Sequence, residues 1–180
     1  MNSIKTLVTA CGALFVSSFF SISAMAQTPK LSDAEIASVA VVANQIDVTY
    51  AALAKQKSKS ADILQFAKIM ANDHKAVIAQ ATALVKKLGV TPKNNAVSKS
   101  LLSDAEKTKK MLRTKSGMAF NKAYIDNEVA YHKAVINAVE SLLIPQTKNS
   151  ELKELLQNVV PALKAHLAHA EMVQKNYVGK

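Results

Sequence analysis

Apolar residues recur every three or four positions over most of the chain, which is the spacing that builds one buried face on a helix. This pattern predicts four long helices, at residues 32–55, 61–88, 117–143 and 150–177. A capping box at Ser32-Asp33-Ala34-Glu35 begins the first helix, Gly89 follows the second, and Pro145 follows the third. Pro161 lies inside the fourth, where we expect a kink because proline has no amide hydrogen and clashes with the preceding turn.

The segment of residues 90–115 has no continuous apolar face. It contains Pro92, the pair Asn94-Asn95 and several lysines, and only residues 101–112 have helical spacing. We therefore expect a connection here, and not a core helix. Two helical hairpins joined by one long crossover form the ferritin-like topology. The predicted fold is all-α: a ferritin-like four-helix bundle with one long crossover connection that carries a short extra helix.

The first 26 residues have the features of a secretory signal peptide. Lys5 supplies a positive charge, an apolar stretch follows, and Ala24-Met25-Ala26 is a small-x-small cleavage site. A lipoprotein-like box ends at Cys11, but cleavage there would leave most of the apolar stretch in place, so we expect no lipid anchor. Cys11 is also the only cysteine. We expect residues 27–180 to form one periplasmic domain without disulfides or thiol ligands.

Five polar residues lie on or beside the predicted apolar faces. They are Asp47 in the first helix, His74 in the second, Glu128 and His132 in the third, and His166 in the fourth. With a rise of about 1.5 Å per residue and one crossover, all five fall within a turn or two of the middle of the bundle. We therefore expect three imidazoles and two carboxylates to form a cluster in the interior.

This cluster has two interpretations. Imidazoles and carboxylates bind first-row transition metals such as zinc, manganese or iron, and bundle interiors hold such sites. Alternatively, the buried groups only hydrogen-bond to one another and fix the register of the helices. The chain contains no Glu-x-x-His, so the usual di-iron pattern is absent. Asp73 and His169 are weaker candidates, and we expect Asp73 to face solvent or to pair with a lysine.

Basic residues outnumber acidic ones by 23 to 13, and the excess is concentrated between residues 86 and 122. A basic surface there suits anionic envelope polymers or lipid headgroups, whereas the simpler interpretation is a solvated face. The region has one arginine and no aromatic residue before Phe120, so we expect no nucleic-acid partner. Its basic residues are Lys86, Lys87, Lys93, Lys99, Lys107, Lys109, Lys110, Arg113, Lys115 and Lys122.

No catalytic motif supports an enzymatic function. The chain has no G-x-S-x-G nucleophile elbow, no P-loop and no G-x-G-x-x-G sequence. Its methionines outside the leader are scattered, which is typical of packing and not of a copper-binding run. We therefore expect neither catalytic residues nor an organic cofactor.

Four stretches, taken together, are similar to one known family. They are LSDA at residues 31–34, FAKIMANDH at 66–74, AYIDNEVAYHKAV at 123–135 and VVPALKAHLAHAE at 159–171. They resemble the DUF4142 family of exported bacterial ferritin-like domains, often labelled "predicted outer membrane protein". The resemblance extends over residues 31–173 and implies a ferritin-like bundle in the periplasm or outer envelope, without a settled activity.

The family pattern also agrees with the candidate cluster residue by residue. It has an acidic residue at the position of Asp47, Asp-His at Asp73-His74, His at His132, and Pro followed by His at Pro161 and His166. Asn44 and Gln45, in contrast, stand where the family commonly has small residues. We expect this departure to alter the packing beside the cluster.

Two functional hypotheses follow from the sequence. The first is a non-enzymatic, stress-related binding module of the bacterial envelope, with the basic connection as its contact surface. The second is a metal-binding protein, with or without redox chemistry, that uses the His and carboxylate cluster. Both hypotheses depend on where the imidazoles and the lysines lie in the fold.

Overall fold

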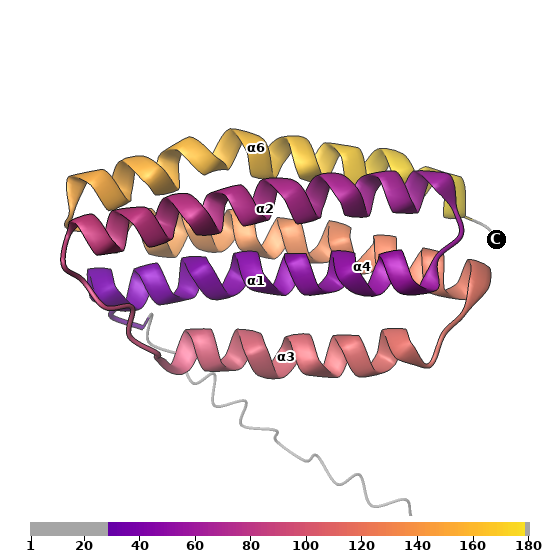
Figure 1. Ribbon diagram of the computed structural model, residues 1–180, viewed down its shortest axis with the longest axis horizontal. Coiled ribbons are helices and arrows are strands. Elements are labelled where there is room, and N and C mark those ends of the chain that lie inside the picture. The colour runs from indigo at the N-terminus through magenta and orange to yellow at the C-terminus, as the bar shows by residue number, and fades with distance from the viewer. Residues whose placement is uncertain (1–28, 179–180) are drawn as a thin grey trace, which may run out of the picture.

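All regular structure in residues 29–178, the range that the computed structural model describes, is helical (Figure 1). The predicted signal peptide lies outside this range. A π-helical turn, Val139–Leu143, follows α4, and a 3-10 turn, Lys175–Tyr177, ends the described chain. The helices are α1 Asp33–Lys57, α2 Ala61–Lys87, α3 Ala96–Arg113, α4 Gly117–Ala138, α5 Ile144–Gln146 and α6 Ser150–Gln174.

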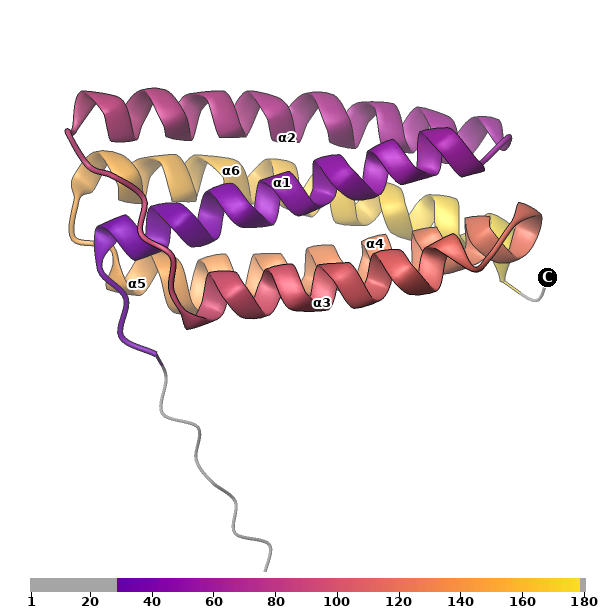
Figure 2. The same ribbon diagram turned by 60° about the horizontal axis from the view of Figure 1, so that its bottom comes forward.

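The four long helices α1, α2, α4 and α6 form the predicted bundle. The α1–α2 turn lies at one end and the turn between α4 and α6 lies at the other (Figures 1 and 2). Because α2 and α4 run in the same direction, the chain must return along the bundle between them, and α3 makes this return (Figure 2). The predicted all-α, ferritin-like topology with one crossover is therefore confirmed.

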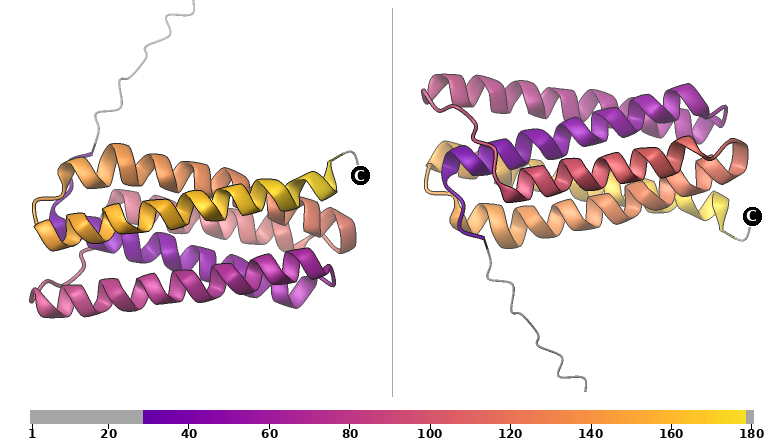
Figure 3. Two further views of the ribbon diagram at one scale, coloured as in Figure 1. Left: turned by 90° about the horizontal axis from the view of Figure 1, so that it is seen from above. Right: turned by 90° about the horizontal axis from the view of Figure 1, so that it is seen from below.

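The crossover is more ordered than the sequence pattern predicts. Its helix spans Ala96–Arg113 instead of residues 101–112, and it packs along α1 on the face seen from below (Figure 3). Asn95 caps the helix, since its side chain accepts a hydrogen bond from the Ser98 amide at 3.0 Å. Leu112 is fully buried in the main apolar core. The expectation of a connection without a core contribution was therefore wrong.

The two prolines affect their helices less than expected. The third predicted helix does not end before Pro145: it continues through the π-helical turn into α5, with the proline in the first turn of α5. Proline is tolerated there because the first turn needs no amide donor from it. Similarly, α6 runs through Pro161 without interruption, and its ribbon bows gently (Figure 1).

Two apolar clusters lie on either side of the middle of the bundle. The cluster near the α1–α2 turn contains aromatic side chains such as Phe66, Phe120 and Tyr124, and the other is built from Ile, Val and Leu. Helix α1 is long and apolar enough to cross a membrane, yet 61% of its most apolar window is buried against other helices. This burial is typical of a core helix, and it places Asp47 of α1 inside the bundle.

A carboxylate joins the start of α2 to the C-terminal turn. Asp62 accepts hydrogen bonds from the Tyr177 hydroxyl at 2.8 Å, the Asn176 amide at 3.1 Å and the Ile63 backbone amide at 2.8 Å. Partial burial raises the pKa of this carboxyl, but the hydrogen bonds, with one from Ser60, outweigh it and lower the pKa to about 2.

We expect the Asp62→Asn variant to be about 1 kcal/mol less stable than the wild type at neutral pH, because it loses charge-assisted hydrogen bonds. A depressed pKa in the folded state gives stability that is present above the unfolded value of 3.8 and is lost as the pH falls toward about 2. Urea unfolding at neutral pH and at about pH 2 tests this. Equal stability of the two proteins at neutral pH would contradict the prediction.

Candidate metal centre

The four bundle helices bring five buried polar side chains together near mid-height. Asp47 comes from α1, His74 from α2, Glu128 and His132 from α4, and His166 from α6. Each is at most 7% exposed. Two groups within this set, His74–His132–His166 and Asp47–Glu128–His132, have candidate ligand atoms that all lie within 4.8 Å of one another. The structure therefore brings together every residue that the sequence proposed for the site.

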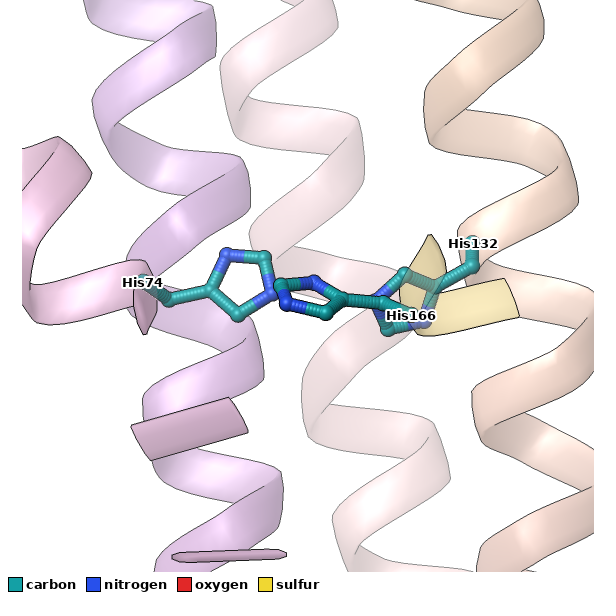
Figure 4. Close-up of side chains that lie close together, drawn as sticks. All are labelled: His74, His132 and His166. Atoms are coloured by element: carbon teal, nitrogen blue, oxygen red, sulfur yellow. The ribbon is translucent and has the colours of Figure 1, made fainter. Parts of the chain in front are cut away.

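The three imidazoles come from three different helices and converge on one point (Figure 4). The ring centroids of His74 and His166 are 5.2 Å apart, and His132 lies 5.7 Å from each of them. For metal–nitrogen bonds of about 2.0–2.1 Å and tetrahedral angles, the ring centroids of three histidine ligands lie about 5 Å apart. The observed triangle is therefore close to the geometry of a three-histidine metal site.

A hydrogen bond fixes the orientation of the His74 ring. Its Nδ1 lies 2.7 Å from Asn44 Oδ1, and the Asn44 amide in turn donates to the Ala40 carbonyl at 2.8 Å. The second bond orients the amide so that its oxygen faces the imidazole. Nδ1 of His74 is therefore the protonated nitrogen, and Nε2 keeps its lone pair.

The other two histidines are held in the same way. His132 Nδ1 donates to the Glu128 backbone carbonyl at 2.9 Å, one helical turn earlier. His166 Nε2 donates to Asp73 Oδ2 at 2.9 Å. Such partners on the far nitrogen are typical of metal-binding histidines, because they fix the tautomer and aim the free nitrogen.

The inward-facing nitrogens have no hydrogen-bond partner. These are His74 Nε2, His132 Nε2 and His166 Nδ1, and Asp47 Oδ1 lacks a partner as well. A purely structural polar network would pair these atoms, because a buried polar atom without a partner costs free energy. Four unpaired acceptor atoms at one place are what a cation site requires.

Asp47 is the carboxylate closest to the free nitrogens. Its Oδ2 lies 3.3 Å from His74 Nε2 and 4.0 Å from His132 Nε2. The first separation equals the distance of roughly 3.3 Å between two ligands that share one tetrahedral ion, and the second is longer. Asp47 is therefore the carboxylate best placed to be a fourth ligand beside the three imidazoles.

Glu128 lies on the other side of His132. Its Oε2 is 3.7 Å from His132 Nδ1, the nitrogen that points away from the imidazole triangle. Burial, and then the neighbouring Asp47 carboxylate, raise the pKa of Glu128 well above its ordinary value. Burial raises the pKa of Asp47 to about 7, partly offset by the neighbouring Glu128 carboxyl. Both carboxyls of this pair therefore bind a proton more readily than an exposed carboxyl does.

The imidazoles of His74 and His132 are neutral in the metal-free protein. Burial, and then the proximity of the other two histidines, lower the pKa of His74 to about 3. Burial also lowers the pKa of His132 to about 4, against a raising effect of its bond to the Glu128 carbonyl. Neutral imidazoles offer lone pairs, which is the form that binds a metal ion.

The structure adds to or corrects the expectations for three residues around the cluster. Asp73 is exposed to solvent as expected, but its carboxylate pairs with His166 and not with a lysine. His169 lies outside both ligand groups and packs edge-to-face on Phe66, with a centroid separation of 5.2 Å. Asn44, expected to affect only packing, orients His74. Position and spacing gave no signal for the Asp73–His166 pair, because its partners are 93 positions apart.

The comparisons with known proteins agree with this fold. A solved structure described as CopM in the Cu(II)-bound form is similar, with a TM-score of 0.62 and 12% sequence identity; the similarity covers 83% of this chain and 99% of that one. At this identity the similarity shows a shared fold. The search of curated proteins found no match. The family model for DUF4142, a domain of unknown function, matches residues 21–173. The chain therefore belongs to the DUF4142 family.

Proposed function

We propose that this protein binds one divalent transition-metal ion, zinc or copper(II), through His74 Nε2, His132 Nε2, His166 Nδ1 and Asp47. The observation that carries the proposal is the set of unpaired, buried nitrogens, each aimed by a hydrogen bond on the opposite side of its ring. Three nitrogen donors favour zinc and copper, whereas manganese prefers oxygen ligands. The fold shared with a Cu(II)-bound protein supports the inclusion of copper.

The ligand set favours binding over catalysis. Four protein ligands close a tetrahedral site, whereas catalytic zinc sites keep one position open for water or substrate. The donors come from four different helices, so a bound ion would also hold the bundle together. We therefore propose metal sequestration or carriage in an exported protein of the periplasm, without an enzymatic reaction.

Equilibrium dialysis of the untagged protein against zinc or copper(II), followed by elemental analysis, tests this function. We expect one equivalent of metal per chain. We also expect the Asn44→Ala variant to bind the metal about 10- to 100-fold more weakly, because His74 loses the partner that aims it. Asn72→Ala, on the exposed face of the same helix as His74, is the matched control and should bind like the wild type. Less than a tenth of an equivalent in the wild type would refute the proposed function.

A second candidate function concerns the outer face of α3. Lys99, Lys110 and Arg113 are exposed and form no ion pair within the described chain. Leu102 and Met111, on the same helix, are 45% and 41% exposed. Exposed apolar side chains between unpaired cations are typical of a helix that contacts an anionic lipid surface. This supports the hypothesis of an envelope-binding module.

Co-sedimentation with phosphatidylcholine vesicles, with and without phosphatidylglycerol, tests this second function. We expect binding to the anionic vesicles at low salt and its loss at high salt, because surface charges are screened. The charge-reversal variant Lys99→Glu/Lys110→Glu should bind at least tenfold more weakly. Equal binding at both salt concentrations, or equal binding to the neutral vesicles, would count against it.

A further inference from the structure

A cavity of about 360 Å³ extends from the histidine cluster through the bundle interior. Asp47, His74 and His166 line one part of it, and Ala37 and Leu152 mark the part nearest the turn between α4 and α6. At about 1.5 Å per residue, Asp47 and Ala37 are about 15 Å apart along α1. The cavity therefore has a polar part at mid-height and a long extension along the helices.

Small aliphatic side chains keep this space open. Ala40 and Ala43 face it from α1, Ala81 from α2, and Ala134 and Ala138 from α4. Elsewhere within the bundle the walls are mainly Ala, Val and Leu, with Tyr50, Asn127 and Tyr131 among them, and residues of α3 also line the cavity. Alanine at these lining positions leaves a volume that larger residues would otherwise fill. The walls therefore offer an apolar surface that a hydrocarbon chain can contact.

The polar part provides the second observation. Asp47, His74 and His166 are each more than 90% buried, and Asp47 Oδ1, His74 Nε2 and His166 Nδ1 have no hydrogen-bond partner. All three atoms accept hydrogen bonds, or bind a cation, and none of them donates. A molecule that fills the cavity can satisfy them with one donor group at its end.

We propose that the cavity binds a single-chain aliphatic molecule with an uncharged hydroxyl head, with the hydroxyl at the histidine cluster and the chain along the aliphatic walls. The unpaired acceptor atoms of the cluster favour a hydroxyl as the polar group of the ligand. In the metal-free protein the hydroxyl donates to a free imidazole nitrogen, and beside a bound ion its oxygen faces a positive charge. A carboxylate head would instead meet the Asp47 carboxylate. The inference goes beyond metal binding and does not require it.

The size of the cavity agrees with a medium-length chain. A protein cavity of about 150 Å³ holds benzene, with six carbon atoms. By the same proportion, the space here accommodates about 14 non-hydrogen atoms. A fatty alcohol of ten carbons falls below this limit, so it fits without displacing the walls.

Calorimetric titration with 1-decanol, on metal-free and on zinc-loaded protein, tests the proposal. We expect saturable binding of one molecule per chain in the metal-free protein. We expect 1,10-decanediol to bind at least tenfold more weakly, because its second hydroxyl must enter the aliphatic part. No saturable binding of 1-decanol, or equal affinity for the diol, overturns the proposal. The metal-free arm separates this result from the metal-binding function, which the dialysis experiment tests independently.

Larger side chains at lining positions should fill the cavity, and the same substitution outside the lining is the control. Ala81→Leu adds a side chain at a 5% exposed position of the lining, and we expect it to weaken 1-decanol binding at least tenfold and to leave the protein folded. Ala138→Leu fills the space from α4 and serves if the first variant does not fold. Ala76→Leu, exposed on α2 and outside the lining, should bind like the wild type. Unchanged binding by a folded filling variant overturns the proposal.

Discussion

Zinc at a thousand times its dissociation constant is expected to raise the free energy of unfolding by about 4 kcal/mol, since only the folded chain presents the site. For a chain of this length, this corresponds to an increase in Tm of about 8–16 °C. The unfolded chain does not present the site, because the four ligands lie on four helices that are distant along the sequence. Thermal unfolding with zinc, and again after addition of a chelator, measures it.

Two histidine variants distinguish zinc bound at the cluster from zinc bound elsewhere on the protein. His132→Gln removes the imidazole shared by both ligand groups, and we expect it to abolish the increase in Tm. His169→Gln removes a histidine outside both groups, so its increase should equal that of the wild type. An equal increase in His132→Gln would show that zinc binds elsewhere.

The bundle was predictable from the sequence because each long helix repeats its apolar positions many times. A repeated pattern tolerates single exceptions, so the positions of α1, α2 and α6 were predicted within a few residues. The extent of α3 was not predictable in this way, because it contacts the bundle with few residues, such as Ala105 and Leu112. Its start depends instead on the Asn95 cap.

The continuation of the helix through Pro145 depends on a local change of hydrogen bonding. In the π-helical turn before Pro145, each backbone hydrogen bond spans five residues instead of four. The amide hydrogen that proline lacks is therefore not required there, and the helix continues. A sequence rule that ends helices before proline does not include this possibility. The prediction therefore stopped one turn early.

The five residues of the cluster were predictable from two properties of a long helix. The apolar spacing shows which side of the helix faces the interior, and the rise per residue gives the position along the bundle. The hydrogen bonds that orient the rings were not, because they depend on side-chain geometry across helices. Asn44 lies next to His74 in space but 30 positions earlier in the sequence, and nothing in its spacing indicates the contact. These partners favour the metal-binding interpretation of the cluster, since they leave one nitrogen of each ring free.

A final prediction uses the conflict between stability and binding at Asp47. Asp47→Asn is expected to stabilise the metal-free protein, because it removes a buried carboxyl whose pKa is raised to about 7 by burial. A raised pKa in the folded state gives stability that is complete below the unfolded value of 3.8 and is lost as the pH rises through about 7. At about pH 8 the wild type has lost this stability, so the gain in Asp47→Asn should be on the order of 4 kcal/mol, because the pKa rises from 3.8 to about 7 and one pKa unit corresponds to about 1.36 kcal/mol.

The same variant should bind zinc at least 100-fold more weakly, since even the outer partners of metal ligands account for about 10- to 100-fold in affinity. Thermal unfolding of the metal-free protein and zinc titration at about pH 8 measure the two effects. Asp104→Asn, at an exposed position, controls for the loss of one negative charge and should change stability by less than about 0.5 kcal/mol. If Asp47→Asn instead destabilises the metal-free protein and binds zinc normally, Asp47 is a structural partner of Glu128. If Asp47 is a metal ligand, its replacement should raise the stability of the metal-free protein and lower the affinity for zinc. The reason is that the buried negative charge is favourable only when a cation lies beside it.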